Sequence, residues 1–150
     1  RIPDRVNYIN AETLAVDLGI SIEHSYTNDS GSYTNLIRTK VSGKNKPSII
    51  SGSVFEGGHP RLVNILGYEI DVAPYGTMLF TWNKDVPGVI GSVGTILGNA
   101  SVNIGGYLLS RGINDDEAFS VIRVDSEVSK EILVALQRLP EIISIQQLHC

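Results

Sequence analysis

The second half of the chain alternates between two kinds of hydrophobic periodicity. Residues 77–83 repeat with a period of two, which is typical of a half-buried strand. Hydrophobic residues then recur at helical spacing from Val86 to Leu97, and Asn99 with the residues after it indicates the end of this helix. The pattern therefore predicts a strand followed directly by an amphipathic helix.

The remaining residues of this half repeat the same alternation. Two strands are predicted at residues 102–111 and 118–125, and the turn formers of residues 112–116 join them as a hairpin-type loop. A second helix over residues 132–139 is stopped by Pro140, and residues 142–148 form a last strand. The order strand, helix, strand, strand, helix, strand predicts a ferredoxin-like βαββαβ domain.

The first half is richer in strands. Asn10 can cap a helix that ends at Gly19. Five short strands are predicted after it, separated by turns at residues 42–47 and 57–60: residues 20–26, 36–41, 48–54, 62–65 and 68–72. The fold class is therefore α+β, with a small β-rich α/β domain over residues 1–74 and the βαββαβ domain over residues 77–150. Pro74-Tyr75-Gly76 is a short, stiff connector that we expect to transmit movement.

The loop from Asn83 to Gly88 has the composition of a ligand site. Pro87 suits the first helical position, and Gly88 lets a ligand approach the backbone closely. The free N–H groups at the helix start would attract a carboxylate, and Asp85 supplies a negative charge beside them. A zwitterionic amino acid has both matching charges.

Composition excludes several classes of function. The net charge of −4 and the lack of a basic stripe argue against nucleic acid as a partner. The three histidines are far apart and lack the spacing of metal ligands, so we expect no metal site. The sequence contains no apolar run long enough for a membrane helix, and its single cysteine, Cys150, excludes an internal disulfide. We expect a cytoplasmic protein that does not contact membranes.

Catalytic motifs are absent from the sequence. It contains no Gly-x-Gly-x-x-Gly fingerprint, no Gly-x-Ser-x-Gly elbow and no convincing Ser/His/Asp constellation. The chain begins with Arg1 rather than Met, and we expect it to be a piece of a longer protein. We therefore predict no catalytic residues and no cofactor in these residues, and a regulatory role.

The second half resembles the ACT domain, a small-molecule sensor of metabolic enzymes. The resemblance is carried by Asn83-x-Asp85-x-Pro87-Gly88-Val89-Ile90-Gly91, Gly94-x-x-Leu97-Gly98, Val102-Asn103-Ile104 and Leu136-x-x-Leu139-Pro140. It implies a homodimer that binds an amino acid such as L-serine between the loop of one chain and Asn103 of its neighbour. The effector-binding residues that it implies are Asn83, Asp85, Pro87, Gly88, Val89, Ile90, Asn103 and Ile104.

The first half resembles the intervening domain of long-form D-3-phosphoglycerate dehydrogenases. The resemblance is carried by Val6-Asn7-Tyr8-Ile9-Asn10-Ala11, Gly52-Ser53-Val54-Phe55, Pro60-Arg61-Leu62-Val63 and Gly67-Tyr68-Glu69-Ile70-Asp71. It implies a parent enzyme that uses NAD, bound outside these residues, in the first step of serine synthesis. It also implies an anion site with Arg61. The position at which some relatives carry a second basic residue falls near Ala73 here, so this chain departs from that pattern. Arg38, Lys40, Lys44 and Lys46 are local possibilities.

Two other functions remain open. The small (beta) subunit of an iron–sulfur-dependent L-serine dehydratase resembles the same pair of domains, and its cluster would be held by a separate catalytic chain. Alternatively, the second domain could be an assembly domain that senses no ligand. An upstream nicotinamide-binding motif would favour the dehydrogenase, and amino-acid binding would exclude a purely structural role.

Overall fold

The computed structural model describes residues 6–7, 9–44, 47–112 and 116–150. The chain divides into two compact units, residues 1–31 and residues 32–150. The second unit contains both sheets of the molecule and the candidate ligand loop.

The first unit contains one helix, α1 (Ala11–Asp17). Gly19, at φ 72°, ends the helix as predicted, because its N–H and that of Ile20 donate to the carbonyl oxygens of Val16 and Ala15. The strand predicted at residues 20–26 is wrong, since these residues form no strand. Their alternating pattern favours a strand, but the described residues of this unit supply no neighbouring strand to pair with the backbone.

The first sheet lies in the second unit and is built from four consecutive antiparallel strands. They are β1 (Ile37–Val41), β2 (Ser48–Phe55), β3 (His59–Ile65) and β4 (Tyr68–Val72), in the order β1-β2-β3-β4. These four predicted strands are confirmed. His59 and Pro60 belong to β3 rather than to the predicted turn, because Gly57 and Gly58, at φ 83° and 80°, already reverse the chain. Asn45 and Lys46 of the other turn lie outside the described residues.

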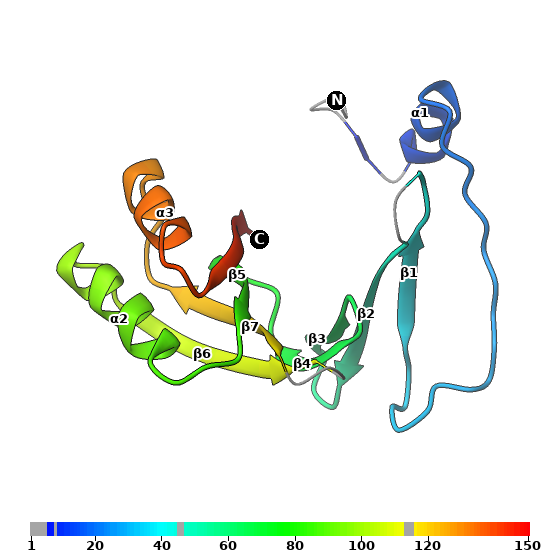
Figure 1. Cartoon of the computed structure of the whole chain (residues 1–150). Helices are drawn as coiled ribbons and strands as arrows, with labels where there is room; N and C mark the ends of the chain where they lie inside the picture. Colours follow the sequence, from blue (N-terminus) through cyan, green and yellow to red (C-terminus); the bar gives the residue numbers. More distant parts are fainter. Residues whose placement is uncertain (1–5, 8, 45–46, 113–115) are drawn as a thin grey trace. The chain divides into compact units, whose positions relative to one another are not determined.

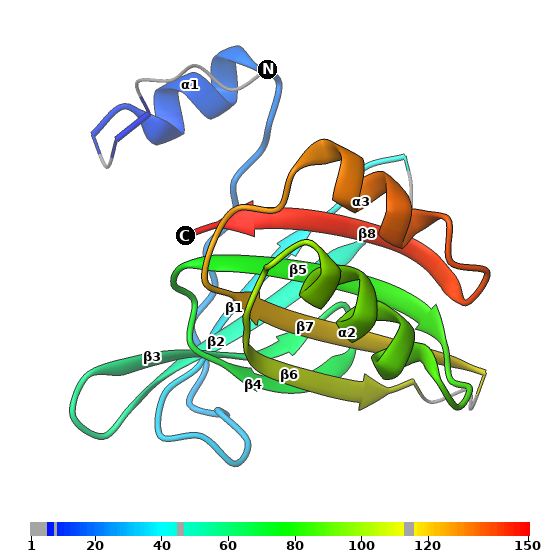
Figure 2. The ribbon, with the colours of Figure 1, turned by 90° about the vertical axis from the view of Figure 1, so that its left-hand side faces the viewer.

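The second sheet has the predicted βαββαβ order of elements. It comprises β5 (Thr77–Lys84), α2 (Val89–Asn99), β6 (Ile104–Arg111), β7 (Glu117–Val124), α3 (Lys130–Gln137) and β8 (Ile142–His149). The antiparallel strands lie in the order β6-β7-β5-β8. Both helices cover the same face of this sheet (Figures 1 and 2). Residues 113–115 of the predicted hairpin loop lie outside the described residues.

The core between the helices and the second sheet contains aliphatic side chains from every helix and strand of that domain. Its fully enclosed members include Leu79, Val93, Leu97, Ile122 and Leu136, none of which is exposed to solvent. Val89 and Ile142 are buried in the same core. This core fixes α2, and with it the loop that precedes α2, against the sheet.

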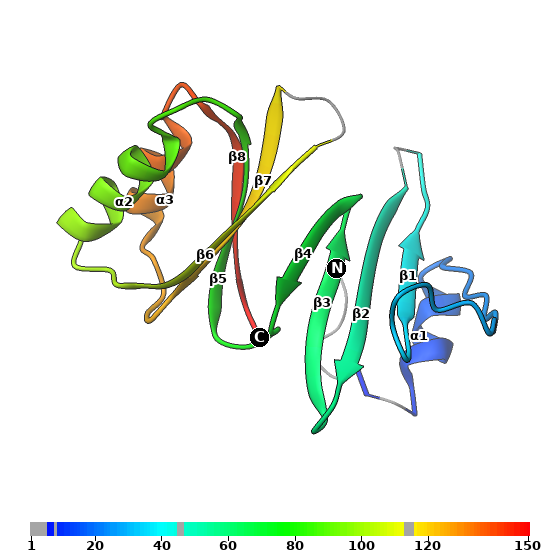
Figure 3. The ribbon, with the colours of Figure 1, turned by 90° about the horizontal axis from the view of Figure 1, so that it is seen from below.

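The other face of the second sheet is covered by the first sheet. Phe119 of β7 is fully buried, and its ring lies 5.2 Å from that of Tyr68 of β4 and 4.7 Å from that of Trp82 of β5. Figure 3 shows the first sheet on the side of the second that lies away from α2 and α3. The residues that pack together between the two sheets form what we call the inter-sheet core. They are Leu62, Ile65, Tyr68, Ile70, Val72, Met78, Phe80, Trp82, Leu108, Phe119 and Val121.

The inter-sheet core corrects one expectation. The period-two pattern of residues 77–83 predicts a half-buried strand, but Thr77 to Thr81 are buried on both faces. Leu79 belongs to the helix-side core, whereas Met78 and Phe80 belong to the inter-sheet core. A strand shows alternation even when a second layer covers its other face, so the pattern alone could not reveal that layer.

Replacing the central ring of the inter-sheet core should destabilise the second unit strongly. Phe119→Ala removes a fully buried ring that contacts both sheets, and such changes cost about 3–5 kcal/mol. Urea unfolding followed by tryptophan fluorescence measures the loss, because Trp82 lies in the same core. Tyr68→Phe is the control, since it keeps the ring and should cost less than about 1.5 kcal/mol. Equal midpoints for Phe119→Ala and wild type would contradict the role of this core.

Candidate functional site

The candidate site is the loop between β5 and α2. The N–H of Lys84 donates to the Glu141 carbonyl at 2.8 Å, and the N–H of Asp85 donates to the Asp116 carbonyl at 3.1 Å. Pro87 does not occupy the predicted first helical position, because α2 begins at Val89 and Gly88 is its N-cap. Gly88 has φ 97°, a left-handed conformation that favours glycine, and the chain can enter the helix only after this reversal.

The start of α2 has properties that favour an anion. Gly88, the N-cap residue, has no side chain that could cap the helix, and the first turn of α2 carries no acidic residue. In an α-helix the first N–H groups have no carbonyl partner within the helix, and the dipole adds positive charge there. The Val89 side chain is buried in the core, whereas Ile90 is exposed at the surface beside the loop. Val89 can therefore offer a ligand its backbone rather than its side chain.

Asp85 forms an ion pair that the sequence did not predict. Its Oδ2 lies 2.7 Å from Nε of Arg111, the last residue of β6. The Asp85 side chain is 19% exposed and that of Arg111 is 71% exposed. The signal was present in the hairpin: antiparallel pairing of residues 102–111 with 118–125 carries Arg111 to the end of the sheet where the Asp85 loop leaves β5.

Asn83 lies beneath the surface and does not join Asp85 there. It is 1% exposed, and its Nδ2 donates to the Lys84 carbonyl at 2.8 Å. Its Oδ1 accepts a hydrogen bond from Ser120 Oγ at 3.4 Å. Burial raises the pKa of the neighbouring Tyr107 phenol, and a hydrogen bond with Ser120 partly offsets that shift. In this chain the Asn83 amide therefore belongs to a buried polar cluster under the helices.

Asn103 occupies the opposite end of β6 from Arg111. Its Nδ2 donates to Asp125 Oδ2 at 2.7 Å, and the Asp125 N–H donates to the Asn103 carbonyl at 3.2 Å. At roughly 3.3 Å per strand residue, about 25 Å separate the two ends of the strand. Ile104 packs against the helix-side core. One chain therefore does not bring Asp85 and Asn103 together.

Arg123 connects the Asn103 end of β6 to the connector between the sheets. Its guanidinium carbon lies 5.5 Å from the centre of the Tyr75 ring, and Nη1 donates to the Tyr75 hydroxyl at 3.3 Å. Nη2 donates to the Gly105 carbonyl at 3.4 Å. Tyr75 thus contacts the second sheet at the end that carries Asn103.

Arg61, the predicted anion ligand, is paired within the chain. Its Nε donates to Asp71 Oδ1, and its Nη2 donates to the Asp71 carbonyl at 3.3 Å. The hydrogen bond to Asp71 raises the pKa of Arg61. An anion at Arg61 would have to compete with this carboxylate, and Lys46 lies outside the described residues.

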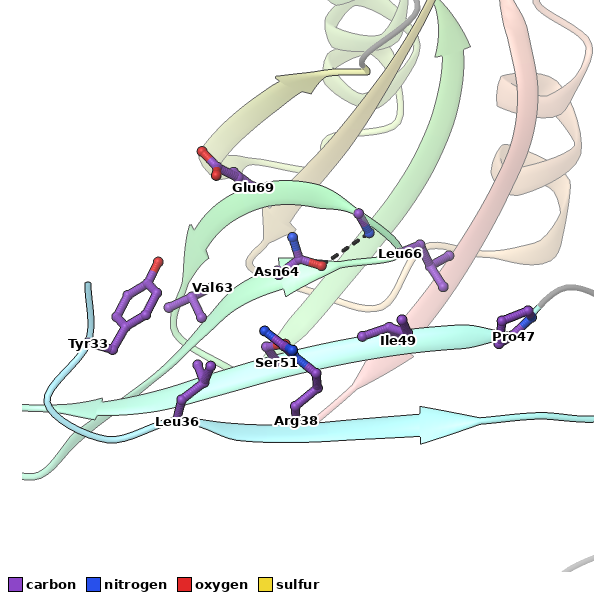
Figure 4. Close-up of a pocket in the computed structure, with 11 residues that line it drawn as sticks. Tyr33, Leu36, Arg38, Pro47, Ile49, Ser51, Val63, Asn64, Leu66 and Glu69 are labelled. Carbon is purple, nitrogen blue, oxygen red and sulfur yellow. Dashed lines mark hydrogen bonds between the residues drawn. The ribbon is translucent and has the colours of Figure 1, made fainter. Parts of the chain in front are cut away.

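A cavity of about 430 Å³ lies on the first sheet. Figure 4 shows Tyr33, Arg38, Ser51 and Asn64 among its lining side chains, and Asn64 Oδ1 accepts a hydrogen bond from the Gly67 N–H at 3.1 Å. The charged groups of the described lining are Arg38 and Glu69. The sequence offered Arg38 only as one of several surface cations and did not predict a cavity.

The described residues include no candidate metal site and no helix suited to a membrane. No group of three or more His, Cys, Asp or Glu side chains is arranged to hold a metal ion. In the same part of the chain, no helix combines the length and the apolar character needed to cross a membrane. The thiol of Cys150 is free and exposed.

Comparison with known proteins agrees with the sequence resemblance. Residues 1–66 match the D-3-phosphoglycerate dehydrogenase intervening domain. The chain is 30% identical over 146 residues to D-3-phosphoglycerate dehydrogenase of Bacillus subtilis, an alignment that covers 97% of this chain and 28% of that enzyme. The same enzyme of Archaeoglobus fulgidus is 29% identical, with coverage of 95% and 27%.

Synechocystis D-3-phosphoglycerate dehydrogenase is 28% identical, with coverage of 91% of this chain and 24% of that enzyme. Among solved structures, the C-terminal domain of the MgtC protein from Mycobacterium tuberculosis aligns with a TM-score of 0.39 and 7% identity, covering 53% of this chain and 92% of that domain. That structural likeness is too slight to bear on function. The chain spans about a quarter of the length of the dehydrogenases that it matches.

The intervening-domain match over residues 1–66 and the alignments along nearly the whole chain show that this chain is similar to a part of D-3-phosphoglycerate dehydrogenases that is consistent with their C-terminal region.

Proposed function

We propose that this chain is the regulatory region of a cytoplasmic D-3-phosphoglycerate dehydrogenase and that residues 77–150 form an ACT domain that binds L-serine. The family match, the βαββαβ order and the loop motif at Asp85 support the proposal. The parent enzyme would use NAD to oxidise its substrate in serine synthesis, with the catalytic residues outside this chain. Binding of serine here would report on the end product of that synthesis.

The observation that carries this proposal is the arrangement of the candidate residues along β6. This strand lies at an edge of its sheet, with Asn103 before its first residue and the Asp85–Arg111 pair at its last. An exposed strand edge can pair with the same edge of a second copy across a two-fold axis. Antiparallel pairing centred near Tyr107 and Leu108 would bring Asn103 of one copy beside Asp85 of the other. Two equivalent sites would then form at the seam.

Each part of L-serine would find a suitable group at such a seam. The Asp85 carboxylate would hold the ammonium, and the free N–H groups at the start of α2 would receive the carboxylate. Asn103 of the second copy could bind the hydroxyl, after exchanging its bond to Asp125 for one to the ligand. The exposed side chains of Val86 and Ile90 offer apolar cover beside the loop.

Removing the charge of Asp85 should weaken serine binding. Hydrogen bonds to charged groups contribute about 1.5–3 kcal/mol, so Asp85→Asn should raise the Kd for L-serine roughly tenfold to a hundredfold. Isothermal titration calorimetry on the chain measures the change. Asp17→Asn, an exposed acid at the end of α1, is the matched control and should bind as wild type does. Unchanged affinity in Asp85→Asn would exclude this carboxylate from the site.

The proposed dimer should depend on β6 and not on the other edge strand, β8. Leu109 of β6 and Ile143 of β8 are both exposed, at 38% and 46%. A lysine on an edge strand opposes pairing with a second chain. Leu109→Lys should therefore give a monomer in light scattering at micromolar concentration, and Ile143→Lys should remain a dimer. The reverse result would move the seam to β8, and a monomeric wild type would refute the dimer.

A further inference from the structure

We infer that Arg111 is a ligand-binding residue of this site and that the pair Asp85–Arg111 selects ligands carrying both an ammonium and a carboxylate. The inference rests on the proposed function and extends it, because it adds Arg111 to the site and states which ligands the site accepts. The ion pair places a full negative and a full positive charge side by side, 2.7 Å apart, where β5 passes into the loop before α2.

Arg111 is able to leave Asp85 for a ligand. Its side chain is 71% exposed, whereas that of Asp85 is 19% exposed, so the guanidinium can turn toward solvent while the ammonium of a ligand takes its place at Asp85. The known contact uses Nε, whereas a guanidinium carries five N–H donors in a planar fork. That fork matches a carboxylate with two parallel hydrogen bonds, which is the strongest arrangement for this pair of groups.

Because Asn83 is buried, a surface residue such as Arg111 is better placed to bind the carboxylate of a ligand. Asn83 is one of the effector-binding residues that the resemblance implies. The Asn83 amide is buried and bonded to the Lys84 carbonyl and Ser120, so it would have to break these bonds to reach a ligand at the surface. Arg111 lies at the surface, beside the residue that would hold the ammonium.

The paired charges determine which ligands fit. A zwitterion would exchange one ion pair for two, with its ammonium on Asp85 and its carboxylate on Arg111. An amine without a carboxylate could only displace Arg111 from Asp85 and would gain nothing in return. A hydroxy acid without an ammonium would bring its carboxylate near the charge of Asp85. The site should therefore reject both.

Calorimetry with three probes tests this selection: L-serine, ethanolamine, which lacks the carboxylate, and L-glycerate, which has the configuration of L-serine and lacks the ammonium. Wild type should bind L-serine and bind the other two at least tenfold more weakly. Arg111→Gln should weaken L-serine at least tenfold and leave ethanolamine unchanged or tighter, since Asp85 is then free. Arg111→Lys keeps the charge but lacks the planar fork of donors, so its affinity for L-serine should lie between those of wild type and Arg111→Gln. Arg138→Gln, an exposed arginine at the end of α3, should bind all three as wild type does.

The possible results distinguish a failure of the inference about Arg111 from a failure of the proposed function. Wild-type affinity for L-serine in both Arg111 variants, or tighter binding, overturns the inference and leaves the proposed function standing. Failure of wild type to bind L-serine overturns the proposed function and the inference with it. Because Arg111 is mostly exposed, thermal unfolding should be unchanged in Arg111→Gln, and this assigns a loss of affinity to the ligand contact.

Discussion

Packing around Phe119 is the constraint on which the rest of the second unit depends. Its ring is fully buried between the two sheets, in contact with Tyr68 on one side and with Trp82 and Phe80 on its own side. Burial of large aromatic side chains is the main favourable term available to a domain of this size. It holds β5 and β7 between the first sheet and the two helices. These strands position the loop at Asp85 and the β6–β7 hairpin, in which β6 ends at Arg111.

The candidate site is built from polar groups that this framework holds near its surface. Among the described residues, the start of α2 has no capping side chain, and Asp85 pairs with the exposed Arg111. At the far end of β6, Asn103 and Asp125 bond to each other, and Arg123 joins the same end to Tyr75. A rigid edge strand thus separates two polar clusters that a second copy of the chain could bring together.

Much of the fold could be predicted from local signals. Periodicity and turn residues predicted the order of β5 to β8, and the end of α1 followed from Gly19. The strand predicted at residues 20–26 failed because a strand needs a partner, which its own sequence does not specify. Burial of β5 on both faces was missed for a related reason, since alternation does not reveal a second covering layer.

For the candidate loop, the sequence predicted local features but not the contacts between distant residues. The loop motif marks Asp85 and Gly88, because a charged residue and a glycine are visible in the sequence, whereas the left-handed conformation of Gly88 emerged from the structure. The burial of Asn83 depends on strand pairing with β7, and the approach of Arg111 depends on the register of a hairpin. Both are contacts between residues distant in the chain, which a single sequence does not specify.

The inter-sheet core also bears on how this region could vary among relatives. A boundary at residues 74–76 would separate Tyr68 and Ile70 from Met78 and Phe119, although these side chains pack together. A chain cut at that point would expose an apolar face on each fragment, and both would tend to aggregate. Substitutions in β4 should therefore covary with those in β5 and β7, and the two halves should be exchanged between relatives only as a matched pair.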